Sequence, residues 1–398
     1  MRAILTINRG SSSLKFAVYQ WSADGGLKRG LSGNFERLGQ ADASLTARDH
    51  SSENSTSEHI DTTTSTDAAG LLIKWLGTRI DLQGLAVIGH RVVHGGMRFS
   101  QPERVTSEML GELNAIRDFD PDHLPAEIAL IESLARHFPK VPQVACFDTA
   151  FHRHMPRVAQ LLAIPRRFDR LGVRRYGFHG LSYAFLMEAL AERSGVEVAT
   201  GRVILAHLGA GASLAAVHGG QSIDTSMGFT PTAGLPMATR SGDLDPGLVS
   251  FLNHAEQLTS DGFHDMVNHH SGLLGISETT GDMQELLKCQ STDSRAAEAV
   301  ELFCYQTKKW IGGFVAVLGG LDALVFSGGI GEHSVEVRRR ICNGLEYFGA
   351  ALDSDANEAG RDLISAQASR VPIYRLATDE ELMIARSAAA TVEPEPHT

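Results

Sequence analysis

The chain has 398 residues, 43% of them hydrophobic and 21% charged, which is the balance of a soluble globular protein long enough for two domains. A formal net charge of −11 argues against nucleic acid as a partner, because a phosphate backbone requires a basic surface. The four cysteines are scattered without a C-x-x-C pair, as expected in a reducing cytosol. No signal peptide and no run of about 18 apolar residues is found, so we expect a cytoplasmic protein that does not span a membrane.

The first half of the chain alternates between predicted strands and helices, with one polar stretch. Residues 42–67 are rich in Ser, Thr, Asp and Glu, which predicts an exposed hairpin or loop with little core content. The other elements expected in this half are strands over residues 3–7 and 14–19, a helix over 68–76, a buried strand over 85–94, a helix over 124–138 and a strand over 141–152 that ends in polar residues.

The second half opens in the same way as the first. A strand over 202–208, the turn GAGAS and a strand over 214–218 match the opening strand, turn and strand of the chain. This recurrence predicts a duplicated domain. Further on, we expect a helix over 296–318, a buried strand ALVFS, a loop GGIGEHS that opens another helix, and a disordered tail.

Three turns rich in small residues each follow a predicted strand: NRGSSSLK, HLGAGAS and SGGIGE. Small residues let backbone N–H groups approach phosphate oxygens, so three such turns in one chain favour phosphate binding over plain hairpins. None is a Walker A loop or a G-x-G-x-x-G turn. The sequence therefore disfavours a P-loop kinase and a dinucleotide-binding dehydrogenase.

Two arginines stand in unusual settings. Arg91 lies beside a buried strand and Arg240 lies in MATRSGDLDPG, and a buried guanidinium needs an anionic partner. That partner is either a substrate or an internal Asp or Glu, and the residues alone leave both open. His90 and His94 cannot share a metal ion, because positions four apart on a strand are separated by about 13 Å.

The chain resembles the acetate kinase family, which comprises acetate and propionate kinases of the sugar kinase, heat-shock and actin superfamily. The matching stretches are NRGSSSLKF, GHRVVHGG, FDTAFH, RRYGFHG, HLGAGAS, GFTPTAGLPMATRSGDLDPG, FSGGIGE and TDEELMIAR. The resemblance implies an α/β fold with a duplicated actin-like core and a nucleotide cleft between two lobes, and a homodimer. The lobes would be residues 1–150, completed by a helix over 379–392, and 151–378, with 393–398 as the tail.

The implied reaction is reversible, Mg²⁺-dependent phosphoryl transfer from ATP to the carboxylate of acetate, with Mn²⁺ as a substitute metal. Two alternatives stay open, a kinase that prefers propionate or butyrate and a nucleotide-binding switch that has lost transfer. The residues implied for catalysis and for the acid are Arg91, Asp148, His179 and Arg240, with Val93, Phe178 and Pro231 around the alkyl group. Those implied for the nucleotide and the metal are Ser11, Ser13, Lys15, His207, Leu208, Gly209, Ala210, Gly211, Asp282, Met283, Gln284, Gly329, Ile330, Gly331, Glu332 and His333, and Asn8 with Glu380 for Mg²⁺.

Phosphoryl transfer needs cations around the phosphoryl oxygens more than it needs covalent chemistry. A carboxylate substrate is already ionised at pH 7, so no general base is required. We therefore expect Asp148 to orient Arg91 or a metal-bound water rather than to abstract a proton.

The sequence departs from the family pattern at four places, none of which removes a catalytic charge. The usual P-L-H-N-P reads PDHLP, with Asp122 in place of the pocket leucine and Leu124 in place of asparagine. The nucleotide loop has Ala210 in place of asparagine, and the usual D-x-R ends in Gln284. Where the family usually has T-S-H after GFHG, this chain has Leu-Ser-Tyr at residues 181–183. These changes bear on the choice of acid and on nucleotide affinity.

Overall fold

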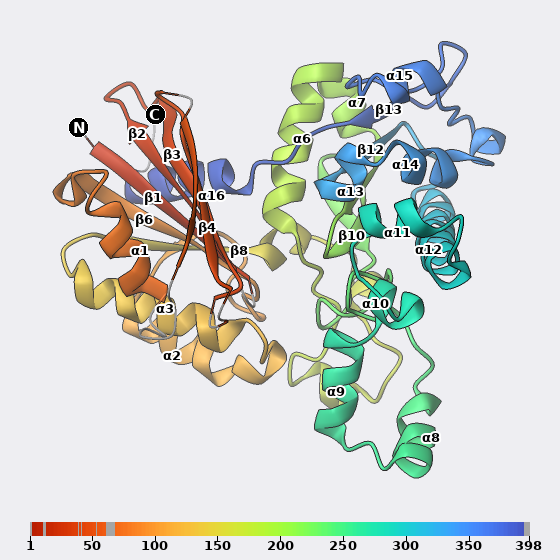
Figure 1. Ribbon diagram of the computed structural model, residues 1–398, viewed down its shortest axis with the longest axis horizontal. Coiled ribbons are helices and arrows are strands. Elements are labelled where there is room, and N and C mark those ends of the chain that lie inside the picture. The colour runs from red at the N-terminus through yellow and green to blue at the C-terminus, as the bar shows by residue number, and fades with distance from the viewer. Residues whose placement is uncertain are drawn as a thin grey trace. The chain divides into compact units, whose positions relative to one another are not determined.

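The computed structural model describes residues 2–10, 13–38, 40, 42–52, 54–60 and 68–393. The chain divides into two compact units, which are described separately (Figure 1). Unit 1 comprises Met1–Ala150 and Asp379–Thr398, and unit 2 comprises Phe151–Thr378. The predictions for Ser11 and for the tail beyond residue 393 lie outside the described residues. No helix in the described part of the chain is long and apolar enough to cross a membrane.

Unit 1 is built on an eight-stranded sheet of order β5-β4-β3-β2-β1-β6-β8-β7. β1 pairs antiparallel with β2 and parallel with β6, and β6 pairs parallel with β8. The strands are β1 (Arg2–Arg9), β2 (Leu14–Trp21), β3 (Leu27–Glu36), β4 (Ser44–Asp49), β5 (Asn54–His59), β6 (Leu85–Val92), β7 (Glu103–Arg104) and β8 (Gln143–Phe147). The helices are α1 (Ala68–Leu76), α2 (Ser107–Ala115), α3 (Leu124–His137) and α16 (Glu380–Val392).

Helices cover both faces of this sheet. α1 and α3 bury Leu72, Leu130 and Leu134 in one core with the inward side chains of the strands. α16 packs on β1, β6 and β8. Gly89 of β6 makes that approach possible, because a Cβ there would lie only 2.6 Å from Cγ2 of Ile384. The close packing brings the first residues of α16 to the ends of β1 and β6.

The polar stretch over residues 42–67 was predicted to contribute little to the core, and for β4 this prediction is wrong. Leu45 and Ala47 are 0% and 5% exposed and belong to the core cluster of unit 1. Thr46 and Arg48, which alternate with them, are exposed. Two apolar residues spaced by two are enough to bury one face of a strand, even in a polar segment. β4 and β5 do form a hairpin, and residues 61–67 lie outside the described part.

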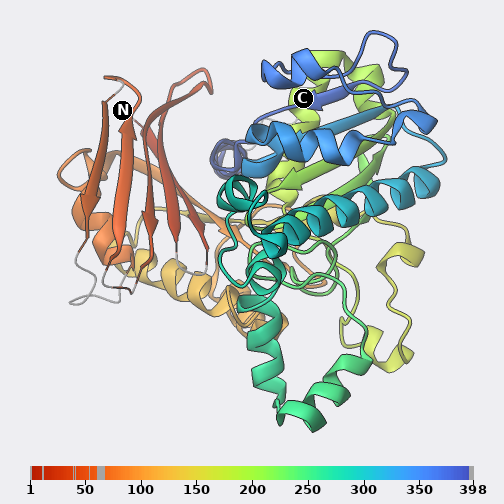
Figure 2. The ribbon, with the colours of Figure 1, turned by 45° about the vertical axis from the view of Figure 1, so that its right-hand side comes forward.

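Unit 2 is built on a five-stranded sheet of order β11-β10-β9-β12-β13. α6 and α7 share a core cluster with one face of the sheet, and the long helix α12 contacts β9, β10 and β11 (Figure 2). The strands are β9 (Arg202–Leu208), β10 (Ala212–His218), β11 (Gln221–Thr225), β12 (Ala323–Ser327) and β13 (Ile373–Arg375). The helices are α4 (Arg157–Gln160), α5 (Arg166–Asp169), α6 (Gly180–Ser194), α7 (Val196–Thr200), α8 (Gly247–Glu256), α9 (Ser260–His269), α10 (Gly272–Ser277), α11 (Met283–Cys289), α12 (Ser294–Leu318), α13 (Gly328–His333), α14 (Val335–Cys342) and α15 (Ser354–Glu358).

The two sheets repeat one topology. In unit 1 the order β3-β2-β1-β6-β8 begins with antiparallel pairs and continues with two parallel pairs, and β11-β10-β9-β12-β13 in unit 2 has the same sequence of directions. β1 and β9 take equivalent places, each at the centre and each followed by a hairpin turn. The structure therefore confirms the expected duplicated α/β core.

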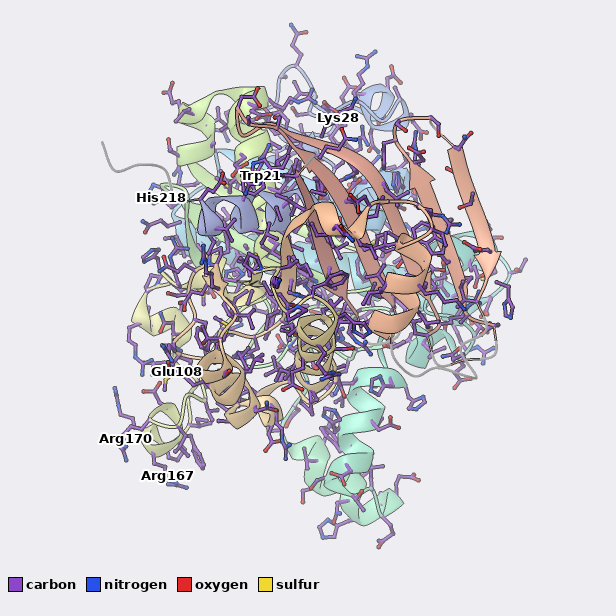
Figure 3. The ribbon with its side chains drawn as sticks, turned by 90° about the vertical axis from the view of Figure 1, so that its left-hand side faces the viewer. Trp21, Lys28, Glu108, Arg167, Arg170 and His218 are labelled. Carbon is purple, nitrogen blue, oxygen red and sulfur yellow. The ribbon has the colours of Figure 1, made fainter. Side chains whose placement is uncertain are left out.

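The segment GGIGEHS was predicted as a loop that opens another helix; a helix does follow it, but the segment itself is helical and not a loop. α13 begins at Gly328, directly after β12, and a second helix, α14, begins after Ser334. Gly328 has φ of +76°, a conformation that glycine adopts without strain, so the chain turns from strand to helix within one residue. Away from these features, charged side chains such as Lys28, Glu108 and Arg167 are exposed on the surface (Figure 3).

Candidate active site

Three predicted site residues meet at the carboxyl ends of neighbouring strands in unit 1. Asn8 is near the end of β1, Arg91 is near the end of β6, and Asp148 directly follows β8. Because these three strands run parallel, their carboxyl ends lie at the same edge of the sheet. In open α/β sheets this edge is where ligands bind.

Arg91 and Asp148 form a buried ion pair. Nε and Nη2 of Arg91 donate to Oδ2 of Asp148 at 2.9 and 2.5 Å, and Asp148 is 1% exposed. Burial alone would lower the pKa of Arg91, but the Asp148 carboxylate raises it above its usual value. Nη1 points another way, at 3.5 Å from Oδ1 of Asn8 and 3.4 Å from the carbonyl oxygen of Arg9. Asp148 thus fixes the orientation of a permanently charged guanidinium.

Asn8 also links β1 to the start of α16. Its Nδ2 donates to Oε2 of Glu380 at 2.8 Å and to Oε1 of Glu381 at 3.3 Å. Amide and carboxylate oxygens are hard donors that suit Mg²⁺, which commonly uses one or two carboxylates together with substrate phosphates. Within the described residues no three His, Cys, Asp or Glu side chains form a metal cage. The oxygens of Asn8 and Glu380 are ligands of the type that Mg²⁺ uses.

The sequence interpretation missed Glu127, a buried carboxyl group next to these residues. Its Oε2 accepts from the backbone N–H of Val93 at 3.0 Å, and the side chain is 2% exposed. Burial raises its pKa to about 8, although the positive charge of Arg91 opposes the rise. A signal existed, since Glu127 lies between Leu124 and Ile131 at helical spacing, on the apolar face of α3.

In unit 2, the segment that carries His179 is held in an unusual backbone conformation. His179 has φ of +59°, which is uncommon for a residue other than glycine. The carbonyl oxygen of Phe178 bonds to Nε2 of His152 at 3.1 Å, and a Cβ on Gly177 would lie 2.6 Å from the His152 ring. His152 is buried, which lowers its pKa to about 4 and keeps it neutral. Such enforced conformations concentrate at functional sites.

The ring of His179 lies beside the HLGAGAS turn. It stacks on His207 with 4.4 Å between ring centroids, and Ser182 Oγ bonds to Nδ1 of His207 at 2.8 Å. A Cβ on Gly211 would lie 3.3 Å from Nε2 of His179 and 3.7 Å from Nη1 of Arg240. His179 and Arg240 thus both approach the turn closely at Gly211, where a side chain would crowd them.

Arg240 is held by the backbone of its own loop region. Its Nη1 donates to the carbonyl oxygen of Pro231 at 3.2 Å. Pro231 is buried, and Phe178 is 1% exposed. The same arginine that faces Gly211 is therefore tied to one of the residues predicted to contact the alkyl group.

A cavity of about 780 Å³ in unit 2 is lined by half of the predicted nucleotide residues. Those that line it are Gly209, Ala210, Asp282, Met283, Gln284, Gly329, Ile330 and His333. Its volume suits a nucleotide-sized ligand. Lys288 also lines it and was missed; it lies one helical turn after Gln284 on α11, and so places a cation near the position where the family pattern has arginine.

Other predicted nucleotide residues do not line this cavity. His207 lies against His179, and Glu332 accepts hydrogen bonds from the backbone N–H groups of Gly328 and Thr378 at 2.9 and 3.4 Å. Glu332 therefore stabilises the start of α13. In unit 1, Lys15 is exposed at the start of β2, and the carbonyl oxygen of Ser13 closes the turn by accepting from Gly10 at 2.9 Å.

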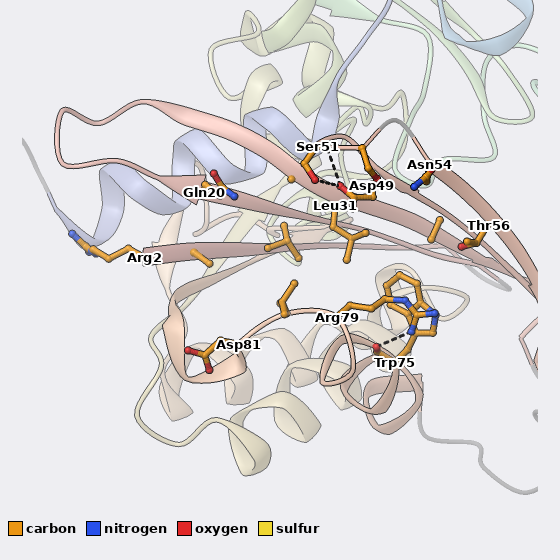
Figure 4. Close-up of a pocket in the computed structure, with 16 residues that line it drawn as sticks. Arg2, Gln20, Leu31, Asp49, Ser51, Asn54, Thr56, Trp75, Arg79 and Asp81 are labelled. Atoms are coloured by element: carbon orange, nitrogen blue, oxygen red, sulfur yellow. Dashed lines mark hydrogen bonds between the residues drawn. The ribbon is translucent and has the colours of Figure 1, made fainter.

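A second cavity, of about 550 Å³, lies in unit 1 among β1, β2, β3, β4, β5 and α1 (Figure 4). Trp75 and Arg79 line it, with the guanidinium 3.9 Å from the ring centroid. It contains none of the residues that the sequence assigned to the site, so we do not include it in the candidate active site.

The two-unit α/β fold, with Arg240 and His179 at a small-residue turn and a nucleotide-sized cavity in the same unit, is that of a phosphotransferase. The chain belongs to the acetokinase family, whose model matches residues 3–386, and this family transfers phosphoryl groups to a carboxylate. The chain is 44% identical to the acetate kinase of Rhodopseudomonas palustris, over 96% of each chain. It is also similar to the crystal structure of a propionate kinase from Francisella tularensis, with a TM-score of 0.90 and 35% identity over 97% of this chain and 99% of that one. For the crystal structure of the acetate kinase of Porphyromonas gingivalis, the TM-score is 0.87 and the sequence identity is 33%, over 99% of this chain and 100% of that one. The predicted family is confirmed.

Proposed function

We propose that this protein transfers the γ-phosphoryl group of ATP reversibly to the carboxylate of acetate, with propionate as a second substrate. The observation that carries this proposal is the pair of basic side chains, His179 and Arg240, flanking Gly211 beside the cavity of about 780 Å³. Phosphates of a nucleotide in that cavity would reach the N–H groups of the turn and these two side chains. Donors aimed at the phosphoryl oxygens are the main source of catalysis in such transfers.

In the forward reaction, a carboxylate oxygen of the acid forms a bond to the γ-phosphorus as the bond to the β–γ bridging oxygen breaks, and ADP leaves. We assign Arg91 to the carboxylate, because Asp148 holds its guanidinium in one orientation and Nη1 points away from that pair. Val93, Phe178 and Pro231 are assigned to the alkyl group. No base is needed, since the acid is ionised at neutral pH.

Mg²⁺ would be held by Asn8 and Glu380 with the phosphates, and it would neutralise charge on the transferring group. The contact from Asn8 Nδ2 to Glu380 keeps this carboxylate at the end of β1. We further propose that the protein works in the cytoplasm as a homodimer. Gel filtration with light scattering would test the dimer.

A hydroxamate assay tests the function. The purified protein, ATP and Mg²⁺ are incubated with hydroxylamine and either acetate, propionate, butyrate or no acid. Hydroxylamine converts any acyl phosphate that forms into a hydroxamate. We expect hydroxamate to form with acetate and with propionate. The absence of hydroxamate with every acid, while ATP still binds, would favour a nucleotide-binding switch and refute the proposal.

A further inference from the structure

We infer that Tyr183 and Ser213 are positioning residues that fix His179 in the tautomer with its proton on Nε2. The inference concerns the role of His179 in the proposed function and rests on it for the kinetic consequence. The tautomer itself follows from the hydrogen bonds alone.

The three side chains form a continuous hydrogen-bonded chain inside unit 2. Ser213 Oγ lies 2.9 Å from Nδ1 of His179 and 2.5 Å from the hydroxyl oxygen of Tyr183. Ser213 and Tyr183 are both 0% exposed. Their elements hold them there: His179 precedes α6 and Tyr183 lies one turn into it, while Ser213 is the second residue of β10. The backbone N–H of Tyr183 donates to the carbonyl oxygen of His179 at 3.0 Å, which closes that first turn.

The protons of this chain can be assigned by counting donors and acceptors. Burial raises the pKa of Tyr183, so its hydroxyl keeps a single proton. Within the described residues, Ser213 Oγ is the hydrogen-bond partner that this hydroxyl has. Since a buried hydroxyl that fails to donate is costly, Tyr183 donates to Ser213. The one proton of Ser213 is then free to point to Nδ1 of His179.

His179 therefore accepts at Nδ1, and the ring carries its proton on Nε2. The reverse order, with Nδ1–H donating to Ser213 and Ser213 donating to Tyr183, would leave the phenol proton buried without an acceptor. Tautomers are assigned in this way, from the partner that each ring nitrogen has.

The tautomer decides what the second ring nitrogen of His179, Nε2, can offer to a ligand. Nε2 is the ring nitrogen on the side of Gly211, where a Cβ would be 3.3 Å away, and Nη1 of Arg240 approaches the same glycine. With its proton on Nε2, His179 offers an N–H donor to an anion at that place. The other tautomer would offer a lone pair, which repels a phosphoryl oxygen. The Tyr183–Ser213 pair thus keeps Nε2 of His179 as a hydrogen-bond donor.

The direct test is ¹⁵N NMR of histidine-labelled protein without substrates, with the His179 signals identified by their loss in His179→Asn. We expect the pattern of an Nε2–H tautomer at His179. An Nδ1–H pattern in the native protein would overturn the inference, and this measurement is independent of whether the protein is a kinase.

The kinetic test is Tyr183→Phe, which removes the donor to Ser213 and keeps the ring. We expect kcat to fall about tenfold while KM for ATP and for the acid changes less than about twofold, and the His179 signals to shift toward a mixture of tautomers. Tyr176→Phe is the matched control, because Tyr176 is also buried and its hydroxyl donates to the carbonyl oxygen of Gly172 at 2.8 Å, away from His179. Its kcat should be unchanged.

If Tyr183→Phe does not fold, Ser213→Ala serves instead, with circular dichroism as the check of folding. Native kcat together with native His179 signals in a folded Tyr183→Phe or Ser213→Ala protein would refute the positioning role. If neither the native protein nor any variant makes hydroxamate, the proposed function fails, while the tautomer assignment still stands or falls on the NMR pattern.

Discussion

Replacing Glu127 with glutamine should make the stability of the protein less dependent on pH. In the folded protein, burial raises the pKa of Glu127 from 4.5 to about 8, so the folded state keeps a proton that the unfolded state loses near pH 4.5. Between these values the folded state binds more protons, and stability therefore falls as the pH rises. Glutamine has no proton to lose and can still accept from the N–H of Val93.

The size of the effect follows from the pKa shift. Each pKa unit corresponds to about 1.4 kcal/mol, so the native protein should lose about 3 kcal/mol relative to Glu127→Gln between pH 5 and pH 7. For a unit of this size, 1 kcal/mol moves Tm by about 2–4 °C, so the difference in Tm should widen by about 6–12 °C. The charged groups that act on Glu127 include Arg91, Asp120, Asp148 and Arg9, and they are common to both proteins.

The assay is thermal unfolding of both proteins from pH 5 to pH 8, followed by circular dichroism at one scan rate. Glu132→Gln is the control, because it makes the same chemical replacement at an exposed position of the same helix. Curves of Tm against pH that run parallel for the native protein and Glu127→Gln would show that Glu127 ionises normally, and the argument from burial would be refuted.

Four further predictions concern the reaction. Arg91→Ala and Arg240→Ala should each lower kcat/KM by about 10²-fold, since one electrostatic donor is worth about 3–4 kcal/mol in such a site, and near-normal turnover of a folded variant would remove that residue from the mechanism. Activity should vanish with EDTA and return with Mg²⁺ or Mn²⁺, and Glu380→Ala should raise the Mg²⁺ concentration needed; an unchanged titration would make Glu380 structural. Gln284→Arg should lower KM for ATP several-fold by adding a cation to the cavity of about 780 Å³, and an unchanged KM would mean that the nucleotide does not approach this position. Asp122→Leu should shift the ratio of the two kcat/KM values toward acetate and against propionate, because one methylene is worth about 1–3 kcal/mol in an apolar pocket. An unchanged ratio would show that Asp122 does not take part in the choice of acid.

The main elements of the fold could be predicted from periodicity and small-residue turns. The strands that begin each half of the chain are apolar runs bounded by Gly and Ser, and α12 has a long helical pattern. β4 was misjudged because only Leu45 and Ala47 carry its apolar signal. α13 was misjudged because glycines, which usually mark loops, here open a helix directly after a strand.

The site was predictable where its residues stand in distinctive runs, and less so where contacts join distant elements. Sequence motifs singled out Arg91 and Asp148, and their pairing across 57 positions was one of two alternatives that the residues left open. The bond from Val93 to Glu127 and the hydroxyl pair of Tyr183 and Ser213 depend on how α3 packs on β6 and how α6 packs on β10. The position of Glu127 on the apolar face of α3 indicates that it is buried, but no local pattern identifies the partner in either contact.

The return of the chain to unit 1 through α16 has a consequence for folding during synthesis. α16 covers one face of the sheet of unit 1, and that face was made more than two hundred positions earlier. At about 5–20 residues per second, residues 151–378 take about 10–45 s to emerge, and throughout this time the apolar surface under α16 has no cover from its own chain. The sheet of unit 1 is therefore completed only at the end of synthesis, when Ile384 and its neighbours pack onto Gly89.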